Sequence, residues 1–588
     1  MTQLLKNRIK NITWILSKEQ IVILETAFLT MIPILLTKIT GQFFSLLAAS
    51  YFGTGNQGWN EFLLATSIPD MLTNVLLGGA IGSVIIPGLI AIKKKQGTEV
   101  FLKAYNSVIT SAIFLFIVIS ILLAVLADII FPLFLKTLLP GQTELDQSEI
   151  SQIVSMMRVL LIPQIILGIS VLVSSGLNIY NRFLVPQLAP LFFNIGRILG
   201  LVILVPLMDY SPWAIVIGVL LGSVLHLGMQ LPVFRMVGFN YKLSFSYTKD
   251  LRYMLFVSLP RTLALMSENI ALTFNDFLAF QIGGLASLNY ANSISLIVPS
   301  LFGATFAYAS FTTLTELFED QDWDKIKYII TKTLNEMFFL ALPFVITILI
   351  LRVAIVRLAF GILPNTRLDL EGTYQIAWVL LWFAVGHIFI CGKWFMYRVF
   401  YAARQTLVPL IVSIISLILT VVLGVLFTNL FSHNSEFSIT STTLSLDNFF
   451  TRGNSIAAVG GIALGMSIAY SIEFLILFAI FNSTKVKLNL RSLTVSLGKK
   501  LIAGISMFVV MYAIYKTWNI LTYALPVSAS LAYRGSTTIN LLMLTLITVF
   551  TSFMVYYLVC LFFRVEELKI LKRYLNPIFR IGGLRIKD

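Results

Sequence analysis

The chain has 588 residues, of which 58% are hydrophobic and 12% are charged, and its mean hydropathy is +0.90. A soluble globular domain carries about 25% charged residues and a disordered chain is poor in apolar ones, so both classes are excluded. Outer-membrane barrels are built from short strands of alternating polarity, whereas the apolar runs here are long and unbroken. The composition therefore predicts an all-α polytopic membrane protein.

The apolar runs define the predicted spans, because about 20 apolar residues cross the ~30 Å hydrocarbon core as a helix. We predict about fourteen transmembrane helices, separated by short polar or Gly/Pro-containing segments. Several runs exceed the bilayer thickness, so we expect them to tilt or to extend into the interface. The predicted spans are residues 21–51, 60–92, 106–135, 153–177, 184–207, 212–233, 253–280, 285–316, 336–362, 375–400, 406–430, 455–482, 498–517 and 537–563.

Lysine and arginine set the predicted orientation, because cytoplasmic loops carry an excess of them. With the N-terminus inside, the cytoplasmic segments hold 30 of the 42 lysines and arginines, and the opposite side holds 5. Both termini are therefore predicted to be cytoplasmic. On such a protein the net charge of +15 indicates contact with anionic membrane lipids and no nucleic acid. No cleavable signal peptide is expected, because the first apolar run is too long for one.

Two predicted cytoplasmic turns repeat at an offset of 221 to 223 residues. Each has an aromatic residue, an arginine and a Val-Pro pair that opens the next helix, where proline is tolerated. This echo suggests a six-helix unit used twice, with a pseudo-two-fold axis along the membrane normal and a site between the lobes, as in transporters. The turns are Tyr180–Pro186 and Tyr401–Pro409. The predicted parts are a cytoplasmic segment 1–20, an N-lobe 21–235, a C-lobe 236–483, a pair of helices 484–565 and a basic cytoplasmic tail 566–588.

The run Leu177–Asn194 contains Asn178, Asn181, Arg182, Pro186 and Pro190 and spans the first of these turns. It resembles the turn between the fourth and fifth helices of the MurJ/MviN family of lipid II flippases. The motifs follow the family's order and spacing over about residues 25 to 565. The other similar motifs are Ile68–Leu72 with Gly78–Ile81 and Pro87, Arg158 with Pro163, Asn289–Asn292, and Phe400–Arg404 with Pro409.

The resemblance implies a member of the multidrug/oligosaccharidyl-lipid/polysaccharide exporter superfamily in the bacterial inner membrane. It implies a transporter, not an enzyme, that moves undecaprenyl-linked lipid II by alternating access of two lobes. The headgroup would cross through a central cavity, and the lipid tail would lie in a groove at residues 484–565. We expect a monomer with cell-wall synthesis proteins as candidate partners. We expect no cofactor and no metal centre, with a coupling monovalent cation as the one further candidate ligand.

The family's cavity is cationic, which suits a pyrophosphate, and one of its charges carries over. Lys38 stands in mid-span where the family has the first arginine of helix one. Its ammonium is expected to contact the substrate, or alternatively to pair with a carboxylate such as Asp276. The family's remaining charged positions hold Phe44-Ser45, Thr73-Asn74, Gly78 and Asn292-Ser293.

The seventh predicted span carries a charged stripe. At 100° per residue, Arg261 and Glu268 lie within about 20° of each other, and Asp276 lies about 60° from Arg261. Asn269 and Asn275 flank this stripe. A charge within a span is costly in lipid and usually faces a cavity or a partner. We expect contact with the headgroup or a coupling cation; the alternatives are a structural ion pair, or snorkelling for Arg261.

Other charged and polar residues have structural interpretations. We expect Arg158 to pair structurally and Arg352, Arg357, Lys393 and Glu473 to pair locally, while Arg197 stays unassigned. Glu61 and Asp70 lie near the ends of the second span. The turn residues Asn178, Asn181 and Arg182 are expected to satisfy carbonyls at a helix end. Gly78, Gly79 and Gly82 allow close helix approach or bending.

Three alternatives to a lipid II flippase stay open at this point. The missing arginines favour an exporter of another lipid-linked oligosaccharide or of an amphiphilic drug. A membrane-embedded enzyme would need carboxylate or histidine clusters in large external loops, and the longest such loop, 431–454, is rich in Ser and Thr. The third alternative is a scaffold that kept the fold and lost the cavity charges.

The charge distribution predicts the side of the membrane on which the chain ends. A green fluorescent protein fused after Asp588 should fluoresce, because it becomes fluorescent in the cytoplasm. Alkaline phosphatase fused at the same place should be inactive, because it is active only outside the cytoplasm. Active phosphatase at this position would overturn the predicted topology.

Overall fold

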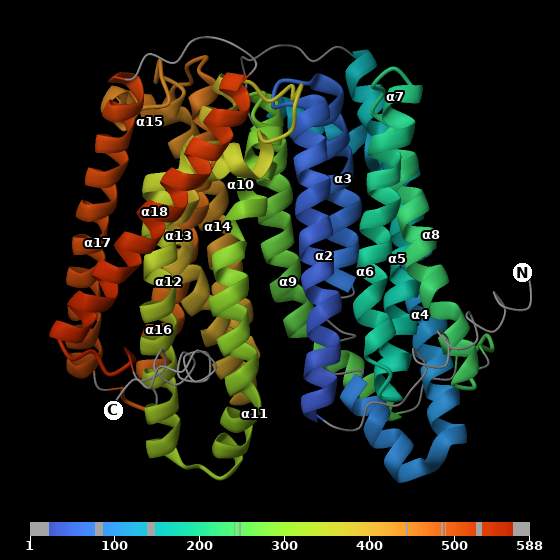
Figure 1. Cartoon of the computed structure of the whole chain (residues 1–588). Coiled ribbons are helices and arrows are strands. Elements are labelled where there is room, and N and C mark those ends of the chain that lie inside the picture. The colour runs from blue at the N-terminus through green and yellow to red at the C-terminus, as the bar shows by residue number, and fades with distance from the viewer. Residues whose placement is uncertain are drawn as a thin grey trace, which may run out of the picture. The chain divides into compact units, whose positions relative to one another are not determined.

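All regular elements of the described residues are helices, which confirms the predicted all-α class (Figure 1). The structure is a computed structural model that describes residues 23–76, 86–137, 147–239, 241–245, 249–442, 445–483, 486–488, 490–524 and 532–568. The predicted segment 1–20, Gly78, Gly79, Gly82 and most of the predicted tail 566–588 lie outside these residues.

The helices group into two compact units, residues 1–286 with 365–368 and residues 287–364 with 369–588. The first unit holds α2 (Ile23–Phe52), α3 (Gln57–Leu76), α4 (Ile86–Thr137), α5 (Gln147–Ile179), α6 (Leu184–Leu199), α7 (Val205–Leu207), α8 (Trp213–Met236) and α9 (Lys249–Gln281). The second begins near α10 (Leu285–Ser295) and holds α11 (Thr305–Glu319), α12 (Trp323–Phe360), α13 (Leu370–Ala402), α14 (Leu407–Phe431), α15 (Asp447–Phe450), α16 (Val459–Asn482), α17 (Leu490–Ala524) and α18 (Ala532–Phe562).

The predicted spans correspond to helices along the described part of the chain. Eleven of these helices are long and apolar enough to cross a membrane. The three other predicted spans, 21–51, 60–92 and 253–280, correspond to α2, α3 with the start of α4, and α9. These three carry charged residues along their length, including Lys38, Asp70 and Asp276.

Two details of the spans differ from the expectation. The predicted interruption between residues 92 and 106 is a kink, because α4 continues from Ile86 to Thr137 and bends at Gly97. Gly97 has φ +86°, a backbone conformation that glycine adopts without a steric penalty. In addition, π-helical segments at Gly200–Leu204 and Pro299–Ala304 join the pieces of the predicted spans 184–207 and 285–316.

The compact units do not divide the chain where the lobes were predicted to meet. Residues 236–483 were assigned to one lobe, yet α9 belongs to the first unit, where it packs on α3 and α4. The short segment Asn365–Leu368 also joins that unit, where the Arg367 amide donates to the Ser50 carbonyl at 2.9 Å. The division into compact units follows the contacts between helices and not the sequence repeat. The assignment of the two lobes therefore stays a prediction.

The two turns that resemble each other in sequence have the same backbone geometry. Asn181 and Arg404 each follow a helix with left-handed φ values of +55° and +58°. In both turns the next amide donates five residues back, which is the hydrogen bond of a Schellman cap. The bonds run from Arg182 to Leu177 and from Gln405 to Phe400, each at 2.9 Å. This agreement supports the predicted internal repeat.

Glycines allow the helices that follow these turns to pack closely on a second helix in each unit. A Cβ on Gly196 of α6 would lie 2.3 Å from the Gly222 Cα of α8. A Cβ on Gly465 of α16 would lie 2.6 Å from the Gly424 backbone nitrogen of α14. Lipid tails are as apolar as the helices, so close van der Waals contact, rather than water exclusion, drives this association.

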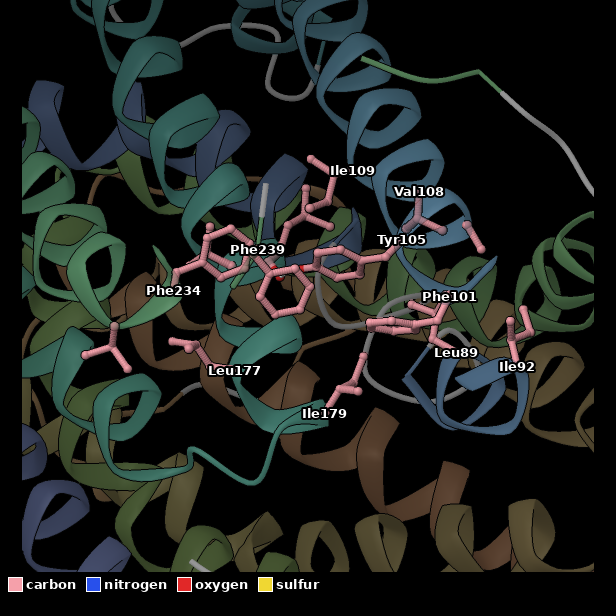
Figure 2. Close-up of a cluster of buried hydrophobic side chains, with 14 of the residues drawn as sticks. Leu89, Ile92, Phe101, Tyr105, Val108, Ile109, Leu177, Ile179, Phe234 and Phe239 are labelled. Carbon is pink, nitrogen blue, oxygen red and sulfur yellow. Dashed lines mark hydrogen bonds between the residues drawn. The ribbon is translucent and has the colours of Figure 1, made fainter. Parts of the chain in front are cut away.

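An aromatic cluster holds one end of the first unit together (Figure 2). Phe234 and Phe239 stack with ring centroids 4.4 Å apart, and Tyr105 packs on Phe239 at 4.9 Å. The Tyr105 hydroxyl donates to the Leu172 carbonyl at 2.8 Å, so its polar atom is satisfied although the side chain is buried. The cluster therefore joins α4, α5 and α8.

The close approach of α6 and α8 predicts a position-specific effect of one methyl group. Gly196→Ala should lower the free energy of unfolding by about 1–3 kcal/mol, because the methyl meets backbone that has no room to move. Thermal unfolding of the purified protein in detergent measures this change. Gly228→Ala in α8 is the control, since its Cβ would meet nothing within 4 Å. Equal effects of the two changes would contradict the packing explanation.

Candidate functional site

A polar group in the first unit combines side chains from four helices. It consists of Asp70 and Thr73 of α3, Gln164 of α5, Arg197 of α6 and Asp276 of α9. Gln164 is buried; its amide nitrogen donates to Asp70 at 2.7 Å, and its amide oxygen accepts from Thr73 at 2.5 Å. Gln164 therefore fixes the Asp70 carboxylate, which remains exposed. We call these five residues the first-unit polar group.

Arg197 and Asp276 complete this group electrostatically. Asp70 attracts the Arg197 guanidinium and repels the Asp276 carboxylate. With both carboxylates ionised, the group carries two formal negative charges and one formal positive charge. Such an arrangement can take up a proton or a monovalent cation, and its guanidinium can turn to an anionic headgroup.

Arg197 also lies on the face of an aromatic ring. Its guanidinium carbon is 3.6 Å from the ring centroid of Phe44 in α2, within the range of a cation–π contact. The same two helices are joined at Asn194, whose side-chain amide donates to the Thr37 carbonyl at 3.1 Å and to the Thr40 hydroxyl at 3.2 Å. The contact between α2 and α6 therefore sets the position of Arg197.

The predicted cavity residue Lys38 is exposed on α2. It forms no ion pair with Asp276 or with another carboxylate among the described residues. The alternative in which Lys38 locks a closed state through Asp276 therefore finds no support in this structure. Its ammonium remains accessible to a ligand.

The stripe predicted on the seventh span is not uniform. Arg261, Glu268 and Asp276 are half-buried in α9, and Asp276 takes part in the first-unit polar group. The Asn269 amide donates to the Leu265 carbonyl of its own helix at 2.8 Å. Asn275 is 1% exposed, and neither end of its amide has a hydrogen-bond partner among the described residues. The structure thus brings Asp276, but not Asn269, together with groups on other helices.

The remaining predicted site residues lie apart from this group. Asn292 is half-buried in α10 of the second unit.

In the turn after α5, backbone amides cap the helix, whereas Asn178 Oδ1 and Arg182 Nε and Nη1 are buried without partners among the described residues. The capping that is seen comes from backbone amides around the left-handed Asn181, and capping of carbonyls by the Asn178 and Arg182 side chains stays a prediction. Pro186 and Pro409 are each the third residue of α6 and α14. Exposed Arg404 pairs with Glu319 at 2.6 Å.

The second unit contains a buried ion pair, as predicted for its in-span charges. Lys393 of α13 and Glu473 of α16 lie 3.3 Å apart with side chains 2% exposed. Glu473 also accepts from the Ser416 hydroxyl at 2.7 Å and from the Tyr397 hydroxyl. The ammonium lies 3.9 Å from the Tyr470 ring centroid. The pair joins α13, α14 and α16 and leaves Glu473 no oxygen for a ligand.

Three further polar residues make structural contacts between helices. Arg158 pairs with Asp128 of α4 at 2.6 Å, as predicted. His226 lies 2.6 Å from the Ser170 hydroxyl, and His387 lies 2.7 Å from the Ser295 hydroxyl.

Sequence reasoning missed Gln164 and left Arg197 unassigned. Both are polar residues within apolar spans, and this feature could have marked them as candidate site residues. Asp70 was placed near a span end, which gave no reason to join it to Arg197, 127 positions later in the chain.

Comparison with known sequences identifies one family. A model of the lipid II flippase MurJ family matches residues 48–531. A lipid II flippase MurJ from Burkholderia cenocepacia is 24% identical over 409 residues, which cover 68% of this chain and 77% of that protein. A probable lipid II flippase MurJ from Thermotoga maritima is 25% identical over 392 residues, which cover 66% and 77%.

Solved structures show the same fold. A lipid II flippase MurJ in an inward closed conformation matches with a TM-score of 0.68 and 18% identity, covering 91% of this chain and 99% of that one. An inward-facing multidrug resistance MATE family transporter of the MOP superfamily matches with a TM-score of 0.56 and 13% identity, covering 77% and 97%.

The buried pair of the second unit predicts a non-additive effect on stability. Glu473→Leu should lower the free energy of unfolding by about 3–5 kcal/mol, because it leaves the Lys393 ammonium buried and unpaired. The double change Lys393→Met and Glu473→Leu should recover most of this loss in thermal unfolding. Glu319→Gln, which breaks an exposed pair, should cost less than about 1 kcal/mol. Additive losses in the double variant would refute the pairing.

Proposed function

Since the chain belongs to the MurJ family of lipid II flippases, we propose that it moves lipid II across the inner membrane by alternating access of its two lobes. The family match over residues 48–531 carries this proposal. The fold supports it, because the described helices match a MurJ structure along 91% of the chain. We propose that the protein acts as a transporter and not as an enzyme, with both termini in the cytoplasm and a monovalent cation as the coupling ion.

Arg197 is our candidate for a second cationic group of the substrate site, beside Lys38. The resemblance places the family's second helix-one charge at Phe44, and the Arg197 guanidinium lies 3.6 Å from that ring centroid. A positive charge therefore lies beside position 44 of α2, but it comes from α6. We propose that Arg197 and the exposed Lys38 contact the pyrophosphate, because guanidinium binds phosphate oxygens in pairs and ammonium acts as a point charge.

Asp70 and Asp276 are our candidates for the coupling function. They lie in the same polar group as Arg197, and when both are ionised they carry two negative charges against its one positive charge. Uptake of a proton or a monovalent cation by the carboxylates would weaken their attraction for the guanidinium and free it for the substrate. The buried pair Lys393–Glu473 is a poor alternative, because its charges already satisfy each other.

An exporter of another lipid-linked oligosaccharide or of an amphiphilic drug is the second candidate function. The replaced cavity arginines favour it, and the fold of the MATE family transporter is compatible with it. Exchange of the gene for the host flippase separates the two candidates. Restored growth, together with lipid II that is accessible from the periplasm, supports the flippase. Failure of both, despite normal membrane insertion, would reject lipid II as the cargo.

The relocated charge predicts a rescue. Arg197→Leu should reduce lipid II exposure about tenfold, the loss expected when one charged hydrogen bond worth about 1.5 kcal/mol is removed. Adding Phe44→Arg should restore most of it, because the guanidinium then comes from α2. Periplasmic accessibility of lipid II measures both variants, with Arg158→Gln as a control that removes an arginine elsewhere in the first unit. Full activity of Arg197→Leu would exclude this role.

The other candidate site residues make a separate prediction. Lys38→Gln, Asp276→Asn and Glu268→Gln keep size and remove charge. Lys38→Gln and Asp276→Asn should each lower lipid II exposure by about tenfold, by the same free-energy reasoning. Lys94→Gln, which removes an exposed charge of α4, should leave it unchanged. Full activity of all three candidate variants would reject the site assignment.

A further inference from the structure

A polar pocket lies in the second unit, where α17 begins and α18 ends. Its volume is about 800 Å³, and it opens among α12, α17 and the turn after α18. Four of its lining side chains are cations, and three are carboxylates. The cations are Lys332, Arg491, Lys499 and Arg564, and the carboxylates are Glu336, Glu566 and Glu567.

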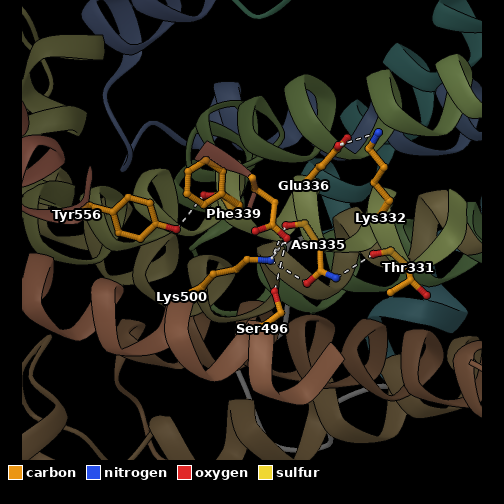
Figure 3. Close-up of polar contacts among 9 residues, drawn as sticks. Thr331, Lys332, Asn335, Glu336, Phe339, Ser496, Lys500 and Tyr556 are labelled. Carbon is orange, nitrogen blue, oxygen red and sulfur yellow. Dashed lines mark hydrogen bonds and ion pairs between the residues drawn. The ribbon is translucent and has the colours of Figure 1, made fainter. Parts of the chain in front are cut away.

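A hydrogen-bond network links three residues of the pocket lining to the buried Lys500 (Figure 3). The Lys500 ammonium is 1% exposed and donates to the Asn335 carbonyl at 3.0 Å, to Asn335 Oδ1 at 2.8 Å and to Glu567 at 2.8 Å. These bonds use its three donors. The other oxygen of Glu567 is buried and has no hydrogen-bond partner among the described residues. The Lys500 ammonium and the Glu567 carboxylate therefore offset each other and add no net charge to the pocket.

The charges that remain at the opening are mainly positive. Lys332 and Glu336 lie 3.8 Å apart and offset each other. Arg491, Lys499 and Arg564 form no ion pair within the described part of the chain. Arg564 is held in place, because it has a left-handed φ of +49° and the next amide donates to the Cys560 carbonyl at 2.9 Å. Three cations thus face one remaining carboxylate, Glu566.

An apolar stripe continues from the pocket along α17. Val495 lines the pocket and is 55% exposed. Ile502 and Val509 follow at intervals of seven residues on the same face and are 48% and 58% exposed. A ligand that fills the pocket and this stripe would be anionic at one end and apolar along the other.

We propose that this pocket binds the phosphate headgroup of an anionic membrane lipid, whose acyl chains lie along the exposed stripe of α17. Arginine binds phosphate oxygens bidentately, and Arg491 and Arg564 line the same pocket as the Lys499 ammonium. The pocket lies wholly within the second unit and shares no residue with the first-unit polar group. The proposed ligand is a membrane phospholipid and not the cargo, although its acyl chains would lie within residues 484–565, where the family resemblance places the lipid tail of the cargo.

Native mass spectrometry of the full chain in detergent tests this site with added phosphatidylglycerol. The pocket variant Arg491→Gln/Lys499→Gln/Arg564→Gln should bind phosphatidylglycerol at least about tenfold more weakly than the wild type, because it removes all three unpaired cations of the opening. Phosphatidylcholine, which has no net charge, should bind both proteins equally. Arg491→Gln alone changes an exposed side chain and should give a smaller loss in the same direction.

The matched control is Lys94→Gln/Lys95→Gln/Lys242→Gln, which removes three exposed charges from the first unit. It should retain wild-type binding of phosphatidylglycerol. An equal loss in the control and the pocket variant would overturn the site, because binding would then follow net charge alone. Complete displacement of phosphatidylglycerol by excess inorganic phosphate would overturn the lipid assignment, since the acyl chains would contribute nothing.

Discussion

A charge inside the hydrocarbon core must meet an opposite charge or water, and the two units satisfy this constraint differently. In the second unit, Lys393 and Glu473 neutralise each other within a buried hydrogen-bond network. In the first unit, Asp70 and Lys38 are exposed, and Asp276 and Arg197 are half-buried. The buried pair therefore stabilises helix packing, whereas the groups of the first unit remain accessible. This contrast separates structural charges from candidate functional ones more sharply than their positions along the spans do.

The packing of the helices follows from the same solvent. Because lipid removes the usual advantage of burying apolar surface, α6 and α8, like α14 and α16, associate through glycines that let the backbones touch. In each pair the first helix, α6 or α14, follows a turn with a left-handed residue. Glycine contacts and tight caps thus occur together in both pairs. The predicted repeat would therefore rest on backbone geometry and close packing more than on identical residues.

The sequence predicted the helical class and the helical regions, because both depend on long apolar runs. It predicted that Lys393 and Glu473 pair locally but did not name their partners, and the structure pairs them with each other from α13 and α16. It did not predict the kink at Gly97, since lysines near a helix kink look like those of a loop. It also did not join Asp70, Gln164 and Arg197, which come from three helices. Periodicity places a residue on one face of its own helix, but it does not say which other helix that face meets.

The position of Arg197 offers an explanation of how this chain could bind a pyrophosphate although most of the family's cavity arginines are replaced. A pyrophosphate responds to where positive charge lies, not to which helix carries it. With the guanidinium held on the ring of Phe44, the α6 side chain supplies charge at a place where the family uses α2. Under the proposed role of Arg197, Asp70 would have a second effect, because it attracts the guanidinium and would compete with an incoming phosphate. Neutralising the carboxylates would weaken that competition, so cation uptake and substrate binding would be coupled through a single guanidinium.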